Sequence, residues 1–116
     1  MDTAALAAVN IDYDEGLRRF SGYGAIYEKY LRKFVDDNLE ETLNGQMASK
    51  DYAGAYETAH KMKGVIGNLS INGLYGTVTA LCDRLKNGAD IEGAVKLYPD
   101  FVQELAAVKT VLREQL

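Results

Sequence analysis

His60 is the only histidine in this chain of 116 residues, and its imidazole is the side chain best suited to covalent chemistry. Apolar residues recur at steps of three and four on either side of it, which predicts a helix that opens at Asp51 and continues to Leu69. The core stripe of that helix consists of Tyr52, Ala55, Ala59, Met62, Ile66 and Leu69. On a helical wheel His60 lies about 130° from the centre of the stripe, so we expect its ring to face the solvent.

The face that carries His60 is predicted to be bare. Gly64 and Gly67 lie four and seven residues after the histidine, and Ala53 lies two turns before it. A glycine inside a helix costs about 1 kcal/mol relative to alanine, so two of them indicate a compensating advantage. Close approach of another backbone or of a partner surface is the usual reason to omit a side chain. We therefore predict an open patch around the ring.

Positive charge is predicted beside the same ring. Lys63 follows His60 by three residues and lies about 60° round the wheel, so its ammonium can reach a group attached to the imidazole. Lys61 adds a second positive charge nearby. Metal binding needs two or more His, Cys or carboxylate ligands, and one histidine without a nearby cysteine does not supply them. No residue marks a nucleophile that His60 would activate, which leaves the imidazole as the candidate nucleophile, or else a plain surface histidine.

The periodicity of the remaining chain is helical, so the expected fold class is all-α. Asp12 and Glu15 form a capping-box pattern that begins a short helix ending near Phe20. The other predicted helices run from about Tyr23 to Met47, from Asn72 to Lys86, and from Asp90 onward, where Pro99 should kink or restart the last one. With the His60 helix they predict one domain over residues 1–116, an antiparallel up-down four-helix bundle with a short additional N-terminal helix.

Composition narrows the classes of function. A net charge of −4 argues against nucleic-acid binding, which needs a basic surface for the phosphates. No apolar run approaches the roughly 20 residues that span a bilayer, and residues 1–9 lack the basic start of a secretory signal. We therefore expect a cytoplasmic protein that does not bind membranes. The lone Cys82 is expected on a core face as a free thiol.

The segment around the histidine resembles a known family. The run Ala59-His60-Lys61-Met62-Lys63-Gly64-Val65-Ile66-Gly67-Asn68-Leu69, followed by Leu74, is similar to the AHxLKGxxxNL signature of histidine-containing phosphotransfer (HPt) domains. The wider layout is similar too, through Ile11-Asp12 with Gly16-Leu17, the apolar residues from Tyr27 to Phe34, and Lys50-Asp51-Tyr52. The resemblance covers almost the whole chain. It departs at Ser70, where the family usually has glycine, so the end of the helix is expected to be capped differently.

The resemblance implies a phosphoryl carrier without autokinase activity. His60 would accept a phosphoryl group on Nε2 from a phospho-aspartate and pass it to a second aspartate, with Lys63 stabilising its charge. The aspartates would belong to receiver domains of response regulators or hybrid histidine kinases, which would also supply Mg²⁺, so neither a metal site nor a cofactor is expected on this chain. The receiver is expected to contact the side of the helix that presents Ala53, Glu57, Lys61, Gly64, Gly67 and Asn68. A monomer is expected.

Two other classes of protein compete with this interpretation. A histidine-kinase dimerisation domain also presents a histidine on a bundle, but it normally has an acidic residue and a proline soon after the histidine, and an ATP-binding domain downstream. Neither feature is present in this chain. The second class is an interaction-only helical adaptor that binds a receiver without carrying phosphate. Such an adaptor would not need His60 together with Lys63 and Gly64, and this combination therefore favours the carrier.

Overall fold

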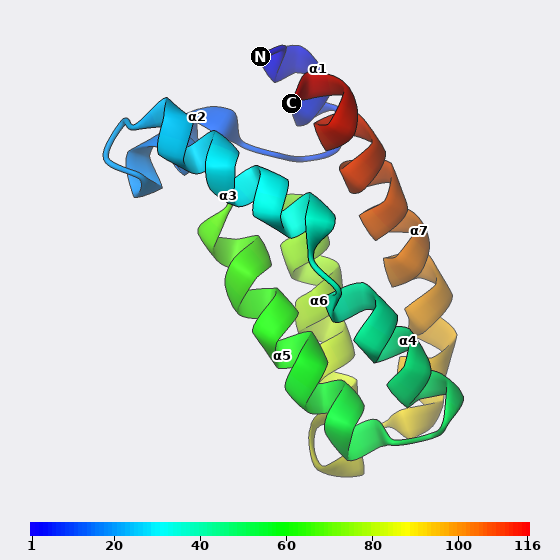
Figure 1. The fold of residues 1–116 in the computed structure, drawn as a ribbon. Helices are drawn as coiled ribbons and strands as arrows, with labels where there is room; N and C mark the ends of the chain where they lie inside the picture. The colour runs from blue at the N-terminus through cyan, green and yellow to red at the C-terminus, as the bar shows by residue number, and fades with distance from the viewer.

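A computed structural model describes residues 1–116, and the chain is helical throughout. The helices, in chain order, are α1 (Thr3–Ala7), α2 (Tyr13–Arg19), α3 (Gly24–Asp36), α4 (Leu39–Ala48), α5 (Tyr52–Asn68), α6 (Asn72–Leu85), the 3₁₀ turn η1 (Lys86–Gly88) and α7 (Ile91–Gln115). Helices α4 to α7 lie side by side, and each runs opposite to the one before it (Figure 1). Helix α3 lies across the end of this group at which α5 terminates.

One hydrophobic core holds these helices together. Twenty-three buried apolar residues form a single cluster, which is the arrangement expected of one domain. The predicted stripe of the His60 helix is confirmed, because its members from Ala55 to Leu69 are buried; Tyr52 alone is half-buried. The lone Cys82 is also buried as a free thiol, and loss of solvation raises its pKa to about 11. The thiol is therefore protonated at neutral pH and behaves as part of the core.

Three aspartates begin their helices as the sequence predicts. The carboxylate of Asp12 accepts the amide hydrogen of Glu15 over 3.0 Å, Asp51 accepts that of Gly54 over 3.0 Å, and Asp90 accepts that of Gly93 over 2.9 Å. Each bond satisfies an amide that the first turn of a helix leaves without a partner. The short helix after Asp12, the His60 helix and the last helix all begin where these caps place them.

The long helix predicted from Tyr23 to Met47 is wrong, because the chain leaves the helical conformation at Asp37 and Asn38. Asp37 has an extended backbone with ψ of 163°, and its carboxylate accepts the amide hydrogen of Leu39 over 3.1 Å. Short polar side chains of this kind compete with the helical hydrogen bonds for backbone groups. The break lets α4 turn away from α3 and pack against α5 (Figure 1).

Two further differences from the predictions concern the last helix and the N-terminal residues. Of the two outcomes predicted at Pro99, a kink or a restart, the restart is wrong, since α7 continues through the proline from Ile91 to Gln115. The proline leaves the carbonyl group of Val95 without its helical partner, but both residues are exposed and water can replace the lost bond. A short helix that the sequence did not predict, α1, precedes α2; the backbone amide of Asp2 joins it to Gln115 of α7 over 2.8 Å.

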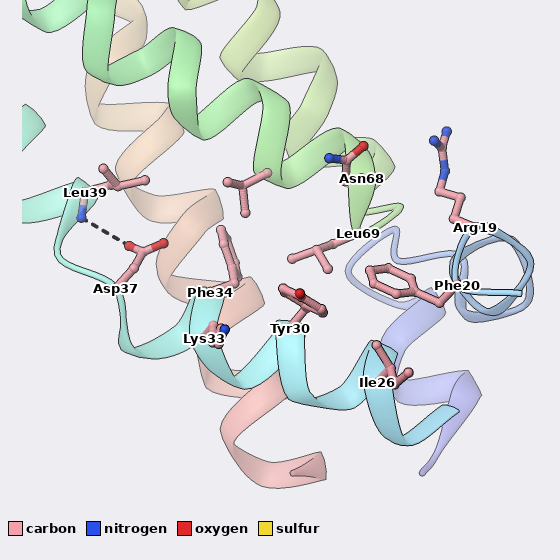
Figure 2. Close-up of a pocket in the computed structure, with 11 residues that line it drawn as sticks. Arg19, Phe20, Ile26, Tyr30, Lys33, Phe34, Asp37, Leu39, Asn68 and Leu69 are labelled. Atoms are coloured by element: carbon pink, nitrogen blue, oxygen red, sulfur yellow. Dashed lines mark hydrogen bonds between the residues drawn. The ribbon is translucent and has the colours of Figure 1, made fainter. Parts of the chain in front are cut away.

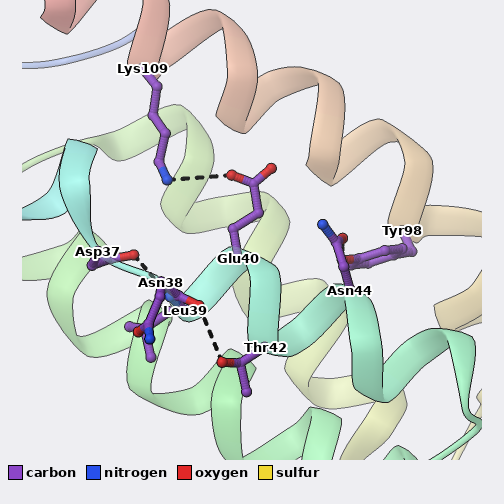
Figure 3. Close-up of polar contacts among 8 residues, drawn as sticks. All are labelled: Asp37, Asn38, Leu39, Glu40, Thr42, Asn44, Tyr98 and Lys109. Atoms are coloured by element: carbon purple, nitrogen blue, oxygen red, sulfur yellow. Dashed lines mark hydrogen bonds and ion pairs between the residues drawn. The ribbon is translucent and has the colours of Figure 1, made fainter.

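Polar contacts join α4 to α7 (Figure 3). The ammonium of Lys109 lies 3.3 Å from a carboxylate oxygen of Glu40, and the hydroxyl of Tyr98 donates a hydrogen bond to Asn44. Lys109 is only 5% exposed, so the ion pair offsets the loss of solvation of a charge that the core would otherwise exclude. These two contacts link α4 to α7. None of the helices has the length and apolar character needed to cross a membrane.

Candidate functional site

The structure places His60 on the solvent side of α5, as the helical wheel predicts. The residue is exposed, whereas Ala59 just before it is fully buried. The ring of Tyr56, one turn earlier, lies 5.8 Å from the imidazole between centroids and is tilted by 42°. The imidazole is therefore supported on one side by an aromatic ring and remains open to solvent on another.

A depression of about 410 Å³ adjoins the histidine. Its wall contains five of the eight residues selected from the sequence, together with three that were not; all eight are Arg19, His60, Lys63, Gly64, Gly67, Asn68, Asn72 and Tyr75. The other three selected residues, Ala53, Glu57 and Lys61, are exposed on α5 but do not line the depression. The predicted histidine, lysine and glycines therefore share one concave site, and the rest of the predicted contact surface continues along the helix.

The two glycines of this site have different surroundings. Apart from the adjoining backbone of α5 itself, no atom lies within 4 Å of the position that a Cβ of Gly64 would occupy, so this turn of α5 is open. A Cβ at Gly67 would instead come within 3.0 Å of the Tyr75 ring. Gly64 thus leaves space that the protein itself does not fill, whereas Gly67 admits a side chain from α6. The open patch predicted around His60 is present at Gly64 and is partly occupied at Gly67.

Lys63 supplies a positive charge to the depression. Its side chain is half-buried, in keeping with its predicted position between the core stripe and the open face. None of the ion pairs in the structure involves Lys63, so no carboxylate neutralises its ammonium. Lys61 is exposed on a neighbouring face. The depression therefore combines an exposed imidazole, a lysine that forms no ion pair and an unobstructed helix turn.

The end of α5 is capped at Ser70 and is also contacted by Arg19 of α2. Ser70 has a positive φ of 56°, the conformation for which glycine is favoured, and it follows the last turn of the helix. Its amide bonds to the carbonyl of Gly67 over 3.2 Å, and the amide of Ile71 bonds to that of Ile66 over 3.2 Å, the pattern of a Schellman cap. The departure from glycine at this position therefore leaves the usual cap geometry in place, contrary to expectation. The serine adds one contact, since Nε of Arg19 donates to its hydroxyl over 3.1 Å.

Three residues of the depression were missed by sequence reasoning. Arg19 comes from α2, and Asn72 and Tyr75 come from the first turn of α6. Nothing local in the sequence links Arg19 to His60, because tertiary packing alone brings α2 to the end of α5. Tyr75 carried only a weak signal in the sequence, as an aromatic residue within a predicted helix, and the structure shows that it is 40% exposed.

A larger groove of about 880 Å³ adjoins the depression and shares Arg19 and Asn68 with it (Figure 2). Seven of its eleven lining residues are apolar: Phe20, Ile26, Tyr30, Phe34, Leu39, Val65 and Leu69. Ile26 and Tyr30 are 45% and 43% exposed, so the apolar surface reaches the solvent. Lys33 lies with its ammonium 4.9 Å from the centroid of the Tyr30 ring at the edge of the groove.

The site can be compared with metal centres and with known proteins. No three His, Cys, Asp or Glu side chains are grouped so that they could hold a metal ion. Comparison with protein-family models, with curated proteins and with solved structures found no match.

Proposed function

We propose that this protein is a histidine phosphotransfer module that relays a phosphoryl group between receiver-domain aspartates through phospho-His60. The observation that carries the proposal is the geometry of one depression, in which an exposed imidazole lies beside the unpaired Lys63 ammonium and the open turn at Gly64. The HPt-like run from Ala59 to Leu69 forms this part of α5. The proposal includes the bundle: α4, α5, α6 and α7 are taken as the four antiparallel helices, with α1 to α3 covering one end.

The reaction needs only groups that an exposed imidazole and an acyl phosphate provide. A neutral imidazole with its proton on Nδ1 has a lone pair on Nε2 that can attack phosphorus. Nε2 of His60 attacks the phosphorus of the phospho-aspartate, a P–N bond forms, and the P–O bond breaks as the aspartate carboxylate leaves with its electron pair. The second transfer reverses this exchange on another receiver. No proton needs to be removed by a general base, in keeping with the absence of an adjacent carboxylate from the depression.

Lys63 supplies electrostatic stabilisation in this proposal. Phosphoryl transfer passes through a loose transition state whose charge is spread over three oxygens, and catalysis is mostly positioning and electrostatics. An ammonium that no carboxylate neutralises retains its full charge for those oxygens. Mg²⁺ belongs to the receiver in this scheme, and no residue of this chain is assigned to it.

The surface around His60 fits a protein substrate. A receiver must bring its aspartate within reach of Nε2, and the missing side chain at Gly64 leaves room for it. The adjoining apolar groove, with exposed Ile26 and Tyr30, offers surface that a docked protein could remove from water. The exposed Ala53, Glu57 and Lys61 extend the proposed contact along α5. An adaptor without phosphate would use the same surface but not the imidazole.

The experiment incubates the purified protein with phosphorylated receiver domains and follows the label. The expected product is an acid-labile, base-stable phosphoprotein that transfers its label to a second receiver. His60→Gln should abolish labelling while helical circular dichroism is unchanged, because the side chain is exposed. Label that persists in His60→Gln would rule out the assigned acceptor. Receiver binding without any transfer would favour the adaptor.

A further inference from the structure

Tyr75 forms the α6 side of the depression, and its ring lies directly against the backbone of α5. A Cβ on Gly67 would stand 3.0 Å from Cε2 and 3.2 Å from Cδ2 of that ring, closer than carbon atoms normally pack. The ring is 40% exposed, so it is not simply a core side chain. Gly67 lowers the stability of α5, but the absence of its side chain allows the exposed Tyr75 ring to pack against the helix.

The same ring is close to the Lys63 ammonium. Nζ lies 6.0 Å from the Tyr75 centroid, at the outer edge of the range in which a cation is attracted to an aromatic face. A carboxylate at this place would also attract the ammonium, but it would cancel the charge that a phosphoryl group needs. An aromatic ring attracts the cation through its quadrupole and leaves the net charge unchanged. Tyr75 is thus a partner that can restrain Lys63 without neutralising it.

We propose that Tyr75 is a positioning residue, whose ring is seated on Gly67 and retains the Lys63 ammonium in the depression that it shares with His60. The role in transfer rests on the proposed function, whereas the contact between Tyr75 and Lys63 does not. Lysine has a long, flexible stem, and restraining it beforehand reduces the entropy lost when the charge must meet the phosphoryl oxygens. The two glycines then have separate tasks, because Gly64 leaves space for a partner and Gly67 seats the ring.

The first test reads the contact without any phosphoryl transfer. Proton NMR of the parent should show the ε-methylene protons of Lys63 shifted upfield by the ring current of Tyr75. Tyr75→Leu should move them downfield, and Tyr75→Phe should leave them near the parent values. Lys33 over Tyr30 provides an internal control, since its shifts should not change in either variant. Lys63 shifts that are the same in parent and Tyr75→Leu would overturn the proposed contact.

The second test measures the rate of His60 phosphorylation by phosphoramidate, a small donor that needs no docking surface. Its phosphoryl group passes to Nε2 as the P–N bond to the donor breaks and ammonia leaves. Tyr75→Leu should slow the reaction by about 2- to 5-fold, the range expected for an exposed cation–π contact. Tyr75→Phe should restore the parent rate, because it keeps the ring. Tyr23→Leu, at a tyrosine that is 64% exposed and lies outside the depression, should react as the parent does.

A double-mutant cycle separates positioning from a general structural effect. If Tyr75 acts through Lys63, then Tyr75→Leu should cause no further loss in a Lys63→Ala background. A loss of equal size in both backgrounds would overturn the proposal, as would a parent rate in Tyr75→Leu. If the parent itself forms no phosphohistidine, the proposed function fails and the role in transfer fails with it. The NMR shifts then still decide whether Tyr75 holds Lys63.

Discussion

The hydroxyl of Tyr27 donates a hydrogen bond to the carbonyl oxygen of Leu69 over 2.6 Å, within the core. It ties α3 to the residue at which the His60 helix ends. Burial raises the pKa of the phenol far above its usual value, which keeps the group a hydrogen-bond donor at every physiological pH. The ring packs against Phe20 at 5.3 Å and Tyr13 at 5.5 Å between centroids. The position of α5 therefore depends on a residue of another helix.

Removal of this hydroxyl should destabilise the fold. Tyr27→Phe keeps the ring but leaves the buried carbonyl of Leu69 without the bond, which should lower the free energy of unfolding by about 1–3 kcal/mol. Urea denaturation measures the change. Tyr30→Phe is the matched control, since its ring is 43% exposed, and it should change stability by at most about 0.5 kcal/mol. Equal stability of the two variants would show that the Leu69 carbonyl finds another partner.

A substitution at Gly16 tests how tightly the Tyr27 ring is packed. A Cβ at this position would overlap the buried Tyr27 ring, with several ring atoms inside normal contact distance. Gly16→Ala should therefore destabilise by about 1–3 kcal/mol or more, as overpacking of a rigid core does. Gly45→Ala, in α4 with open space around the added methyl group, should be neutral or stabilising. Thermal melts of both variants provide the measurement. A stabilised Gly16→Ala would mean that the ring can move.

Local signals account for most of what the sequence predicted correctly. The stripe from Ala55 to Leu69 follows from helical periodicity, and the caps at Asp12, Asp51 and Asp90 depend on residues only three positions away. The outward direction of His60 follows from the same periodicity, because burial of one helix face determines where the opposite face points. No knowledge of other helices is needed for these predictions.

The predictions that failed depend on contacts between distant segments. The break at Asp37 resembles an ordinary polar turn of a long helix in the sequence, and the packing of α4 against α5 decides in favour of the break. Arg19 and Tyr75 join the His60 depression through the packing of α2 and α6, which periodicity does not report. The two glycines likewise appear equivalent in the sequence and differ only in what lies above them.

Lys63 should affect transfer far more than stability. Lys63→Ala removes a charge-assisted contact, for which about 1.5–3 kcal/mol is typical, so transfer should slow by about 10-fold or more. The free energy of unfolding should change by about 0.5 kcal/mol or less, because no ion pair is lost. Rapid-quench transfer assays and urea denaturation provide the two measurements. Lys96→Ala, which breaks only a surface pair with Glu92, is the control. Transfer at the parent rate in Lys63→Ala would remove this lysine from the mechanism.

The carboxyl of Asp37 should make stability depend on pH. Burial raises its pKa, repulsion from the Glu40 carboxylate adds to the rise, and neither the amide of Leu39 nor the nearby Lys109 fully offsets these effects (Figure 3). Between the ordinary carboxyl pKa and the raised value, the folded protein holds a proton that the unfolded chain releases. Stability is therefore lost as the pH rises through this window, and the loss persists at neutral pH.

Asp37→Asn removes the charge and keeps an oxygen that can accept the amide hydrogen of Leu39. The variant should be more stable than the parent at pH 7, and the difference should shrink as the pH falls and disappear below about pH 3, where the parent carboxyl is mostly protonated in both states. Urea denaturation across this pH range measures it. Asp36→Asn, at an exposed neighbour, should change stability by at most about 0.5 kcal/mol. A variant that is less stable than the parent at pH 7 would show that the attraction to Lys109 outweighs the loss of solvation.

Gly64 should show opposite effects on stability and on transfer. No atom outside the adjoining backbone of α5 lies within 4 Å of the position of its missing Cβ, so Gly64→Ala should stabilise α5 by about 0.5–1 kcal/mol through the smaller backbone entropy of alanine. If a receiver must approach His60 over this bare turn, the added side chain obstructs it, and glutamine should obstruct it more than alanine. The melting temperature and the rate of transfer from a phosphorylated receiver are measured side by side for the parent and both variants.

Phosphoramidate serves as the control donor, since it is small enough to reach the imidazole past either side chain. Slower transfer from the receiver with an unchanged rate from phosphoramidate would assign the loss to docking, whereas parent rates with the receiver in both variants would place its docking surface elsewhere on the protein.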